Sequence, residues 1–374
     1  MIRIDSLEVT PLSIPLLEPF VIASGRIDVT RAALVEVVLL DEATGARAHG
    51  LGEAAALPPV TREDQPELLR TIGEARLLLL GIGLGDEPLA AMESIASLLD
   101  SIFDDTPVAR AGVEMALLDA LARLTNVSVR VLLGGALGGG TRTLVTDITL
   151  PIFDVLHTAE LAKQWRARGF TAFKVKVGQD LLRDLAALAA ISEAVPDAVL
   201  RIDANAGFSA SNAIRLLSTI ERLGVRVECF EQPCGEDDLD GMALVTAASR
   251  VPVIADESVR SLDDLARVRD KKAAHGVNLK IAKSGGLLPA LAIGRQARAQ
   301  AMPIMCGGMI ETRLGMTAAA HVAAALGGVD FVDLDTAWLL ASDPFEGGYT
   351  AEGPHMTLVD DVGLGVRRAR GDAT

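Results

Sequence analysis

Short apolar segments separated by Ala- and Leu-rich stretches recur from about residue 144 to residue 334. Each segment has the length of a strand, and each intervening stretch is long enough for a helix, which is the pattern of βα units. The predicted strands are residues 144–150, 172–177, 199–203, 227–231, 252–256, 277–281, 303–307 and 329–333. Eight strands that alternate with helices over about 200 residues predict a closed α/β barrel.

The first 130 residues follow a different order, with strands first and helices afterwards. Residues 2–12 and 31–40 are predicted strands, and residues 62–103, rich in Ala and Leu with acidic interruptions, are predicted helices. A stripe of apolar residues at helical spacing then predicts a buried helix: Val113, Ala116, Leu117, Ala120, Leu121 and Leu124. We therefore predict an α+β domain over residues 1–130 and a barrel over residues 131–340.

The chain becomes Gly-rich after residue 340, and we expect the short strand 356–359 to return to the first domain, so that residues 341–374 complete it. An open, doubly wound sheet is the structural alternative to the barrel. It is disfavoured because no G-x-G-x-x-G sequence follows the first strand. The Gly-rich segment 134–140 lacks that spacing and is expected to be a loop between the domains.

Charge and cysteine content narrow the class of protein. Acidic residues outnumber basic ones 50 to 35, a net charge of −15, which disfavours nucleic acid and anionic membranes as partners. The three cysteines (Cys229, Cys234 and Cys306) do not make a paired framework, which favours a reducing compartment. The apolar run 77–84 is too short to span a bilayer, and the first residues lack the apolar core of a signal peptide. We expect a cytoplasmic protein.

Charged residues stand at the ends of the predicted strands: Lys174, Lys176, Asp203, Glu231, Asp256 and Lys280. From Lys176 onward the successive separations are 27, 28, 25 and 24 residues, about the length of one βα unit. The carboxyl ends of barrel strands meet at one mouth, so we expect these side chains to lie close together.

The three acids predict a metal site. Asp203, Glu231 and Asp256 end consecutive strands, and three like charges together repel strongly without a cation. An all-oxygen site suits Mg²⁺, which also retains positions for water or substrate.

The lysines predict proton transfer. Lys174 and Lys176 are two residues apart in a strand and point to the same face, inward in a barrel. Lys280 lies four strands beyond Lys176, on the opposite side of the barrel. Two opposed amines suggest that a proton leaves one face of a carbon and returns to the other, with Mg²⁺ on the substrate carboxylate stabilising an enediolate. We expect burial and crowded positive charge to lower the lysine pKa toward neutrality.

Together these motifs resemble the enolase superfamily, in its muconate-lactonising-enzyme subgroup. The matching segments are Lys174-Val-Lys176, Asp203-Ala-Asn-Ala-Gly207, Glu231-Gln-Pro233, Asp256-Glu-Ser258 and Asn278-Leu-Lys280 followed by Lys283-Ser-Gly-Gly286. The resemblance implies a modified (β/α)7β barrel with an α+β capping domain formed by the N-terminal region and the C-terminal tail. It also implies lid loops near residues 20–27 and 57–61.

Within the subgroup, the eighth strand is most similar to that of the dipeptide epimerases. Asp333 and Asp335 share a face and resemble the D-x-D that holds a substrate ammonium. The resemblance implies a Mg²⁺-dependent epimerase that transfers a proton at the α-carbon of the C-terminal residue of a dipeptide, with L-Ala-D/L-Glu or a related dipeptide as substrate. Asn205 is a candidate partner of the metal ligands. Arg26 is either the reader of a glutamate side chain or a surface residue.

Other activities of the subgroup remain as alternatives: a muconate-type cycloisomerase, an o-succinylbenzoate synthase or an N-acylamino-acid racemase. Muconate and succinylbenzoate carry no amine, so the acid pair at residues 333 and 335 argues against the first two. The expected partners are a small-molecule substrate and further copies of the same chain in a homo-oligomer.

Overall fold

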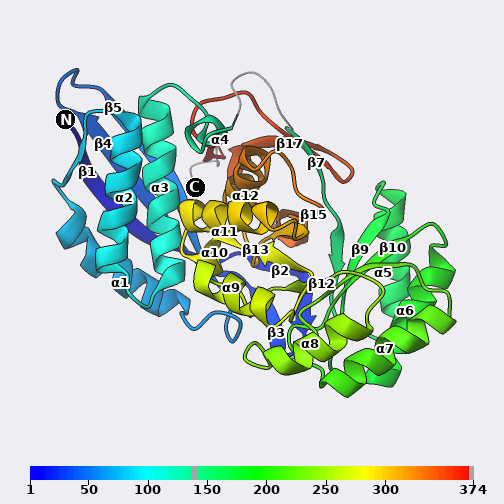
Figure 1. Cartoon of the computed structure of the whole chain (residues 1–374). Helices are drawn as coiled ribbons and strands as arrows, with labels where there is room; N and C mark the ends of the chain where they lie inside the picture. The colour runs from blue at the N-terminus through cyan, green and yellow to red at the C-terminus, as the bar shows by residue number, and fades with distance from the viewer. Residues whose placement is uncertain (136–141, 370–374) are drawn as a thin grey trace.

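The computed structural model describes residues 1–135 and 142–369, and within them eight parallel strands form the central sheet (Figure 1). The strands lie side by side in chain order: β8 (Ile148–Leu150), β9 (Ala172–Lys176), β10 (Val199–Asp203), β11 (Val227–Glu231), β12 (Val253–Ala255), β13 (Gly276–Leu279), β14 (Ile304–Gly307) and β15 (Phe331–Asp333). The outer strands approach each other, because Asp147 N donates to Val332 O at 3.1 Å. The sheet is therefore a nearly closed barrel. Most of the predicted loop 134–140 lies outside the described residues.

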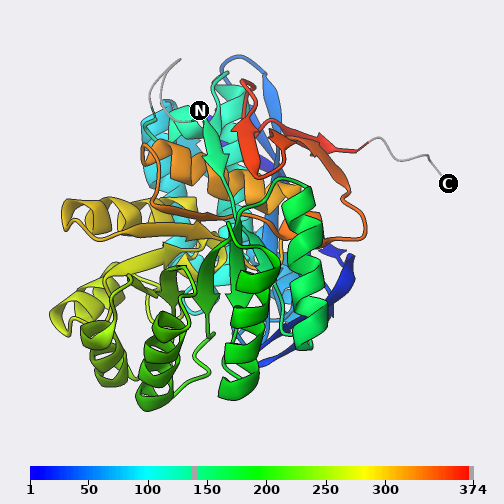
Figure 2. The ribbon, with the colours of Figure 1, turned by 90° about the vertical axis from the view of Figure 1, so that its right-hand side faces the viewer.

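A helical segment follows every strand from β8 to β14 and packs on the outside of the barrel (Figure 2). These segments are α5 (Val155–Ala167), α6 (Leu181–Ala194), α7 (Ala210–Arg222), α8 (Leu239–Ala248), α9 (Leu262–Asp270), α10 (Ile281–Ser284) with α11 (Leu287–Ala299), and α12 (Arg313–Ala325). After β15 the chain enters the 3₁₀ helix η1 (Thr336–Leu339). The predicted (β/α)7β barrel is confirmed.

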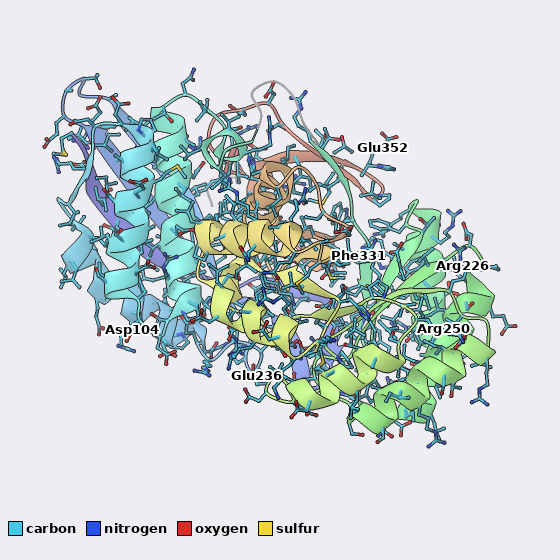
Figure 3. All side chains as sticks on the ribbon, in the orientation of Figure 1. Asp104, Arg226, Glu236, Arg250, Phe331 and Glu352 are labelled. Carbon is cyan, nitrogen blue, oxygen red and sulfur yellow. The ribbon has the colours of Figure 1, made fainter. Side chains whose placement is uncertain are left out.

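The interior of the barrel has an apolar floor and a charged upper layer. Cys229, Ile254, Met305 and Phe331 form a small cluster apart from the main core (Phe331 is labelled in Figure 3). Side chains alternate along a strand, so the residue two positions later faces the same interior. Two positions after Cys229, Ile254 and Phe331 stand Glu231, Asp256 and Asp333. The charged layer therefore lies at the carboxyl ends of the strands.

The N-terminal region is an antiparallel sheet covered by helices. The sheet has the order β5 (Arg47–Ala56), β4 (Arg31–Asp41), β1 (Ile2–Leu12), β6 (Gly83–Gly85), and the helices are α1 (Gln65–Leu79), α2 (Pro88–Ile102) and α3 (Pro107–Leu124). Figure 1 shows α2 and α3 in front of this sheet. The predicted strands 2–12 and 31–40 are β1 and β4, and the predicted helical stretch 62–103 contains α1 and α2.

Helix α3 lies between this sheet and the barrel, and every residue from Val108 to Ala122 is buried. The predicted apolar stripe is thus only one face of a helix that is buried on all sides. Strand β5 approaches α3 so closely that a Cβ at Gly50 would lie 2.0 Å from Ala116 O. Glycine is needed there because a larger residue would force the strand away from the helix.

An acidic residue of the N-terminal region also caps the N-terminus of a barrel helix. Glu53 on β5 accepts hydrogen bonds from Thr312 N at 3.0 Å and from Gly315 N at 3.1 Å. These amides belong to the start of α12, where backbone N–H groups have no partner within the helix. Glu53 therefore serves as a cap for α12 from a distant part of the chain.

The predicted strand 144–150 is wrong as a single element. It comprises β7 (Thr143–Val145), which pairs with β18 (His355–Leu358), and the barrel strand β8. The remaining tail strands are β16 (Phe345–Gly347), β17 (Tyr349–Glu352) and β19 (Val366–Arg368), and α4 (Val129–Leu132) is a short helix before the barrel.

The predicted tail strand 356–359 corresponds to β18, and it pairs with β7 and β17 rather than with the N-terminal sheet. Residues after it do contact α3, where Leu364 N donates to Asp119 Oδ1 at 2.7 Å. The boundaries of the two domains stay a prediction. Among the described residues, no helix combines the length and the hydropathy that crossing a membrane requires.

A hairpin from the N-terminal region reaches the barrel mouth. It consists of β2 (Pro15–Ile22) and β3 (Gly25–Val29). Ile152 N, just after β8, donates to Val21 O at 2.9 Å, and Gln179 Nε2, just after β9, donates to Ile22 O at 3.0 Å. Both donors lie beyond the carboxyl ends of barrel strands, so the hairpin lies against the charged layer.

Candidate active site

The carboxyl ends of the barrel strands gather a set of buried charged side chains. The set comprises Lys174, Lys176, Asp203, Glu231, Asp256, Lys280, Asp333 and Asp335, each at most 8% exposed. Asn205 lies beside them, where its backbone N donates to Asp203 Oδ1 at 2.9 Å and its Nδ2 donates to Glu257 Oε1 at 3.3 Å. The structure thus brings together every predicted site residue except Arg26.

Lys174 occupies the centre of this set. Its Nζ lies 2.6 Å from Asp333 Oδ2, 2.8 Å from Glu231 Oε2 and 3.2 Å from Asp203 Oδ2. One ammonium group therefore contacts acids from three different strands. Burial would lower the pKa of Lys174, but Asp333, Glu231 and Asp203 together raise it well above its ordinary value.

The two other lysines each hold a different acid. Lys176 Nζ lies 2.6 Å from Asp203 Oδ2, and Lys280 Nζ lies 2.7 Å from Asp256 Oδ2. Lys176 ends β9 and Lys280 directly follows β13, four strands further around the sheet. The two ammonium groups therefore approach the acids from opposite sides of the barrel.

The expectation that these lysines have a pKa lowered toward neutrality is wrong for Lys174 and Lys280. Burial does lower the pKa of Lys280, but the carboxylates of Asp256 and Glu231 outweigh it, and the pKa is raised. The prediction assumed that Mg²⁺ is bound to the acids, whereas the carboxylates by themselves surround the lysines with negative charge. Negative charge near an amine favours its protonated form.

Each of the three acids contacts two lysines: Asp203 contacts Lys174 and Lys176, Glu231 contacts Lys174 and Lys280, and Asp256 contacts Lys280 and Lys283. Burial and the neighbouring Asp203 raise the pKa of Glu231 to about 7, so the acids interact strongly with one another. Asn278 Nδ2 donates to Glu231 Oε1 at 2.8 Å, and Glu231 Oε2 forms an ion pair with Lys174 Nζ at 2.8 Å. Three buried carboxylates at the ends of neighbouring strands supply the oxygen ligands that a divalent cation such as Mg²⁺ prefers.

The predicted convergence of these three acids is only partial. Among the described residues, the carboxylates with oxygens within 4.8 Å of one another are those of Asp147, Asp333 and Asp335. Asp203 and Asp256 are held toward Lys176 and Lys280, because a buried carboxylate pairs with the nearest cation. Asp203, Glu231 and Asp256 therefore do not form the compact group of acids that the sequence suggested.

Comparison with known proteins identifies the family of this chain. Residues 6–134 match the N-terminal domain of the mandelate racemase/muconate lactonizing enzyme family, and residues 157–370 match the family described as enolase C-terminal domain-like. The chain belongs to the enolase superfamily. It is 39% identical to an L-Ala-D/L-amino acid epimerase of Populus trichocarpa, over 94% of this chain and 82% of the relative.

Two further relatives of this enolase-superfamily chain match nearly all of it. An aromatic dipeptide epimerase of Herpetosiphon aurantiacus is 37% identical over 98% of this chain and 99% of the relative. The dipeptide epimerase of Enterococcus faecalis, solved with Mg and the dipeptide L-Leu-L-Tyr, superposes with a TM-score of 0.88 at 31% identity, over 97% of this chain and 99% of that one. The chain is an isomerase that acts on amino-acid derivatives.

Three residues of the matching motifs, to which the sequence assigned no role, contact or adjoin the candidate site: Lys283, Gln232 and Glu257. Lys283 Nζ contacts Asp256 at both Oδ1 and the backbone O, each at 2.6 Å. Its position three residues after Lys280, on the short helix α10, could have indicated a shared face. Gln232 Oε1 accepts from Asp256 N at 2.8 Å and so fixes the loop after β12. Burial and Asp256 raise the pKa of Glu257 to about 8.

Arg26 lies apart from the other predicted site residues. It stands on the lid hairpin (β2 and β3), and its side chain is 61% exposed and paired with Asp28 at 2.8 Å. Phe20 pairs with Ile27 across the hairpin, and the Phe20 ring centroid lies 5.9 Å from Lys176 Nζ. Because neighbouring residues of a strand point to opposite faces, Ile27 shares the site-facing side with Phe20 and Arg26 points away.

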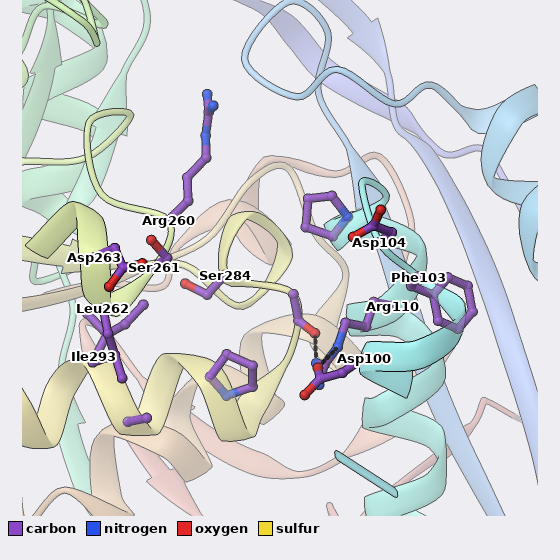
Figure 4. Close-up of a pocket in the computed structure, with 14 residues that line it drawn as sticks. Asp100, Phe103, Asp104, Arg110, Arg260, Ser261, Leu262, Asp263, Ser284 and Ile293 are labelled. Atoms are coloured by element: carbon purple, nitrogen blue, oxygen red, sulfur yellow. Dashed lines mark hydrogen bonds and ion pairs between the residues drawn. The ribbon is translucent and has the colours of Figure 1, made fainter. Parts of the chain in front are cut away.

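A cavity apart from the barrel mouth lies between helices of the N-terminal region and helices of the barrel (Figure 4). This cavity of about 500 Å³ is bounded by α2, α3, α9, α10 and α11. The buried Arg110 in its wall pairs with Asp100 at 2.8 Å and with Glu114 at 3.0 Å. The predicted site residues do not line it, so the barrel mouth remains the candidate active site.

Proposed function

We propose that the protein is a Mg²⁺-dependent dipeptide epimerase in which Lys176 and Lys280 exchange the α-proton of the C-terminal residue from opposite sides. The observation that carries the proposal is the placement of these amines four strands apart in one barrel, with the acids between them. The dipeptide epimerases among the relatives, one of them solved with Mg and a dipeptide, support it. A cytoplasmic location and a homo-oligomer belong to the same proposal.

The metal would be held by Asp203, Glu231 and Asp256. When bound, Mg²⁺ supplies positive charge at the substrate carboxylate and so stabilises the negative charge that develops when the α-proton leaves. Lys174 contacts Asp203 and Glu231 and adds a fixed positive charge to the same region. Asn205 orients Asp203 through its backbone N–H.

Each amine needs a free lone pair to accept a proton and a bound proton to return one, so the negative charge that raises the pKa of Lys280 would have to be offset by Mg²⁺ on the three acids. In an epimerase of this kind, Lys176 would remove the proton from one configuration while Lys280 delivers a proton to the other face, and the roles reverse for the opposite configuration. Asp333 and Asp335 would hold the N-terminal ammonium, since both carboxylates are buried at the mouth beside β15. An ammonium held there fixes the dipeptide relative to the two lysines.

The lid hairpin supports a preference for apolar C-terminal residues. Phe20 and Ile27 face the site beside Lys176, whereas Arg26 points into solvent and pairs with Asp28. An apolar surface does not compensate the desolvation of a glutamate carboxylate. We therefore propose aliphatic or aromatic dipeptides as substrates in preference to L-Ala-L-Glu.

Exchange with solvent tests the activity directly. The protein is incubated with Mg²⁺ and pooled L,L-dipeptides in deuterated water, and mass spectrometry identifies those that gain one deuteron. We expect label in dipeptides with apolar C-terminal residues. Label in N-acyl amino acids alone, or turnover of a succinylbenzoate precursor, would contradict the dipeptide activity and favour the alternative reactions.

Single lysine variants test the two-sided mechanism. Lys176→Ala and Lys280→Ala should each abolish epimerisation, while each variant retains α-proton exchange with only one of the two diastereomers, read by NMR in deuterated water. Lys163→Ala, which removes an exposed lysine of α5, is the matched control and should behave as the wild type. Normal epimerisation by either active-site variant would refute the roles of the lysines.

A further inference from the structure

Three buried carboxylates meet at the junction of the first and last barrel strands. Asp147 directly precedes β8, Asp333 ends β15, and Asp335 follows two residues later. They are 0%, 5% and 1% exposed, and each offers an oxygen within 4.8 Å of the other two. The sequence pointed to Asp333 and Asp335, and the structure adds Asp147.

Each acid of this cluster has a donor on one side. Arg201 Nη1 donates to Asp147 Oδ2 at 2.9 Å, Lys174 Nζ donates to Asp333 Oδ2 at 2.6 Å, and Thr149 N donates to Asp335 Oδ2. The Oδ1 atoms of Asp147 and Asp335 are buried and accept no hydrogen bond from the described residues. Buried acceptors without donors are costly, so the cluster is suited to a group that supplies several donors.

A primary ammonium group matches this requirement. It has three N–H donors and one positive charge, so it can donate to three carboxylates at once. A magnesium ion fits less well, because it demands octahedral geometry and usually retains several waters. We infer that Asp147 is a third carboxylate of the ammonium site, beside Asp333 and Asp335. This inference rests on the proposed epimerase function.

Arg201 holds Asp147 in place through an ion pair. Its guanidinium also donates to Val332 O at 2.8 Å and to Glu228 Oε2 at 2.8 Å, and it lies 5.2 Å from the Phe331 ring centroid. Glu228 is the partner of Arg201 that lies outside the acid cluster, with a side chain 40% exposed. Glu228→Gln therefore perturbs Arg201 while it leaves the three carboxylates intact, which makes it the matched control.

The test compares Asp147→Asn with Glu228→Gln in the full-length, Mg²⁺-loaded enzyme. The substrates are the L-Ala-L-Xaa dipeptide that exchanges best in the deuterium screen and its propionyl analogue, in which the amine is replaced by hydrogen. Loss of one charged hydrogen bond should raise KM for the dipeptide about tenfold or more in Asp147→Asn, with kcat changed much less. KM for the propionyl analogue should stay unchanged in both variants. An unchanged dipeptide KM in Asp147→Asn would overturn the inference.

A measurement on the wild type covers the case in which Asp147→Asn does not fold. Methylation of the dipeptide nitrogen keeps the charge and removes one of the three donors. We expect KM to rise about tenfold for the N-methyl dipeptide, and equal KM values would overturn the inference. If the wild type exchanges no dipeptide at all, the proposed function fails and the inference fails with it. If the wild type is active and KM responds neither to Asp147→Asn nor to N-methylation, the role of Asp147 is refuted and the proposed function stands.

Discussion

Glu63 offers a test in which the effect of one side chain on stability changes sign with pH. The residue is 2% exposed and caps α3, where its two carboxylate oxygens accept from Val108 N and Ala109 N, each at 2.9 Å. Burial raises the pKa of Glu63 to about 7 from its ordinary value of 4.5. A raised pKa means that the folded state binds the proton more tightly than the unfolded state.

The magnitude follows from this pKa difference. Stability from the protonated Glu63 is fully present below pH 4.5 and is lost as the pH rises through 7, a total of about 3 kcal/mol at 1.36 kcal/mol per unit. Glu63→Gln removes this loss, but a glutamine has one acceptor oxygen and leaves one helix N–H without its partner, which costs about 1 kcal/mol. The variant should therefore be less stable than wild type by about 1 kcal/mol at pH 4 and more stable by about 2 kcal/mol at pH 8.

Urea unfolding at pH 4 and pH 8, followed by circular dichroism, measures both differences. Glu67→Gln is the control, because Glu67 lies in the first turn of α1 with its side chain 44% exposed. It should change stability little at either pH. A Glu63→Gln variant that is destabilised equally at the two pH values would show that Glu63 is ionised in the folded protein throughout this range, and the reasoning would be wrong.

Three further predictions concern recognition and packing. Burial and Asp333 raise the pKa of Asp335 to about 6. Because protonation removes the charge that binds the ammonium, kcat/KM for dipeptides should fall about tenfold per pH unit below pH 6. A flat pH profile would contradict this role of Asp335. Ile27→Arg should raise the ratio of kcat/KM for L-Ala-L-Glu to that for L-Ala-L-Phe at least about tenfold, and an unchanged ratio would show that this position does not meet the substrate. Gly50→Ala should lower the free energy of unfolding by about 1–3 kcal/mol because its Cβ would meet Ala116 O, whereas Gly25→Ala, with nothing within 4 Å, should have little effect in the same urea titration.

The elements with strong β-branched or apolar patterns were predictable from the sequence. Residues 2–12, 199–203 and 227–231 were predicted with the bounds that β1, β10 and β11 have. Strand β5 carries no such signal, because its Gly and Ala residues have low strand propensity. It forms because those small residues let it approach α3, a tertiary requirement that a local pattern does not contain.

The candidate site shows a similar limit. The βα period located the residues at strand ends, and Arg26 could not be placed because its face on the hairpin depends on the register with β2. Asp147 precedes a strand, so a search of carboxyl ends does not reach it. The strands of a barrel are tilted and staggered, and this brings the start of β8 level with the end of β15.

The cap that Glu53 provides for α12 limits how this chain can be recombined with its relatives. Glu53 and Thr312 are 259 positions apart in the chain, yet the carboxylate of Glu53 accepts the hydrogen bond of the Thr312 amide. A chimaera that takes its first hundred residues from another superfamily member would place a foreign side chain beside the start of α12. If that side chain is not a carboxylate, the backbone N–H groups of Thr312 and Gly315 lose their acceptor. Successful exchanges should therefore be those in which the donor carries a carboxylate at the position of Glu53.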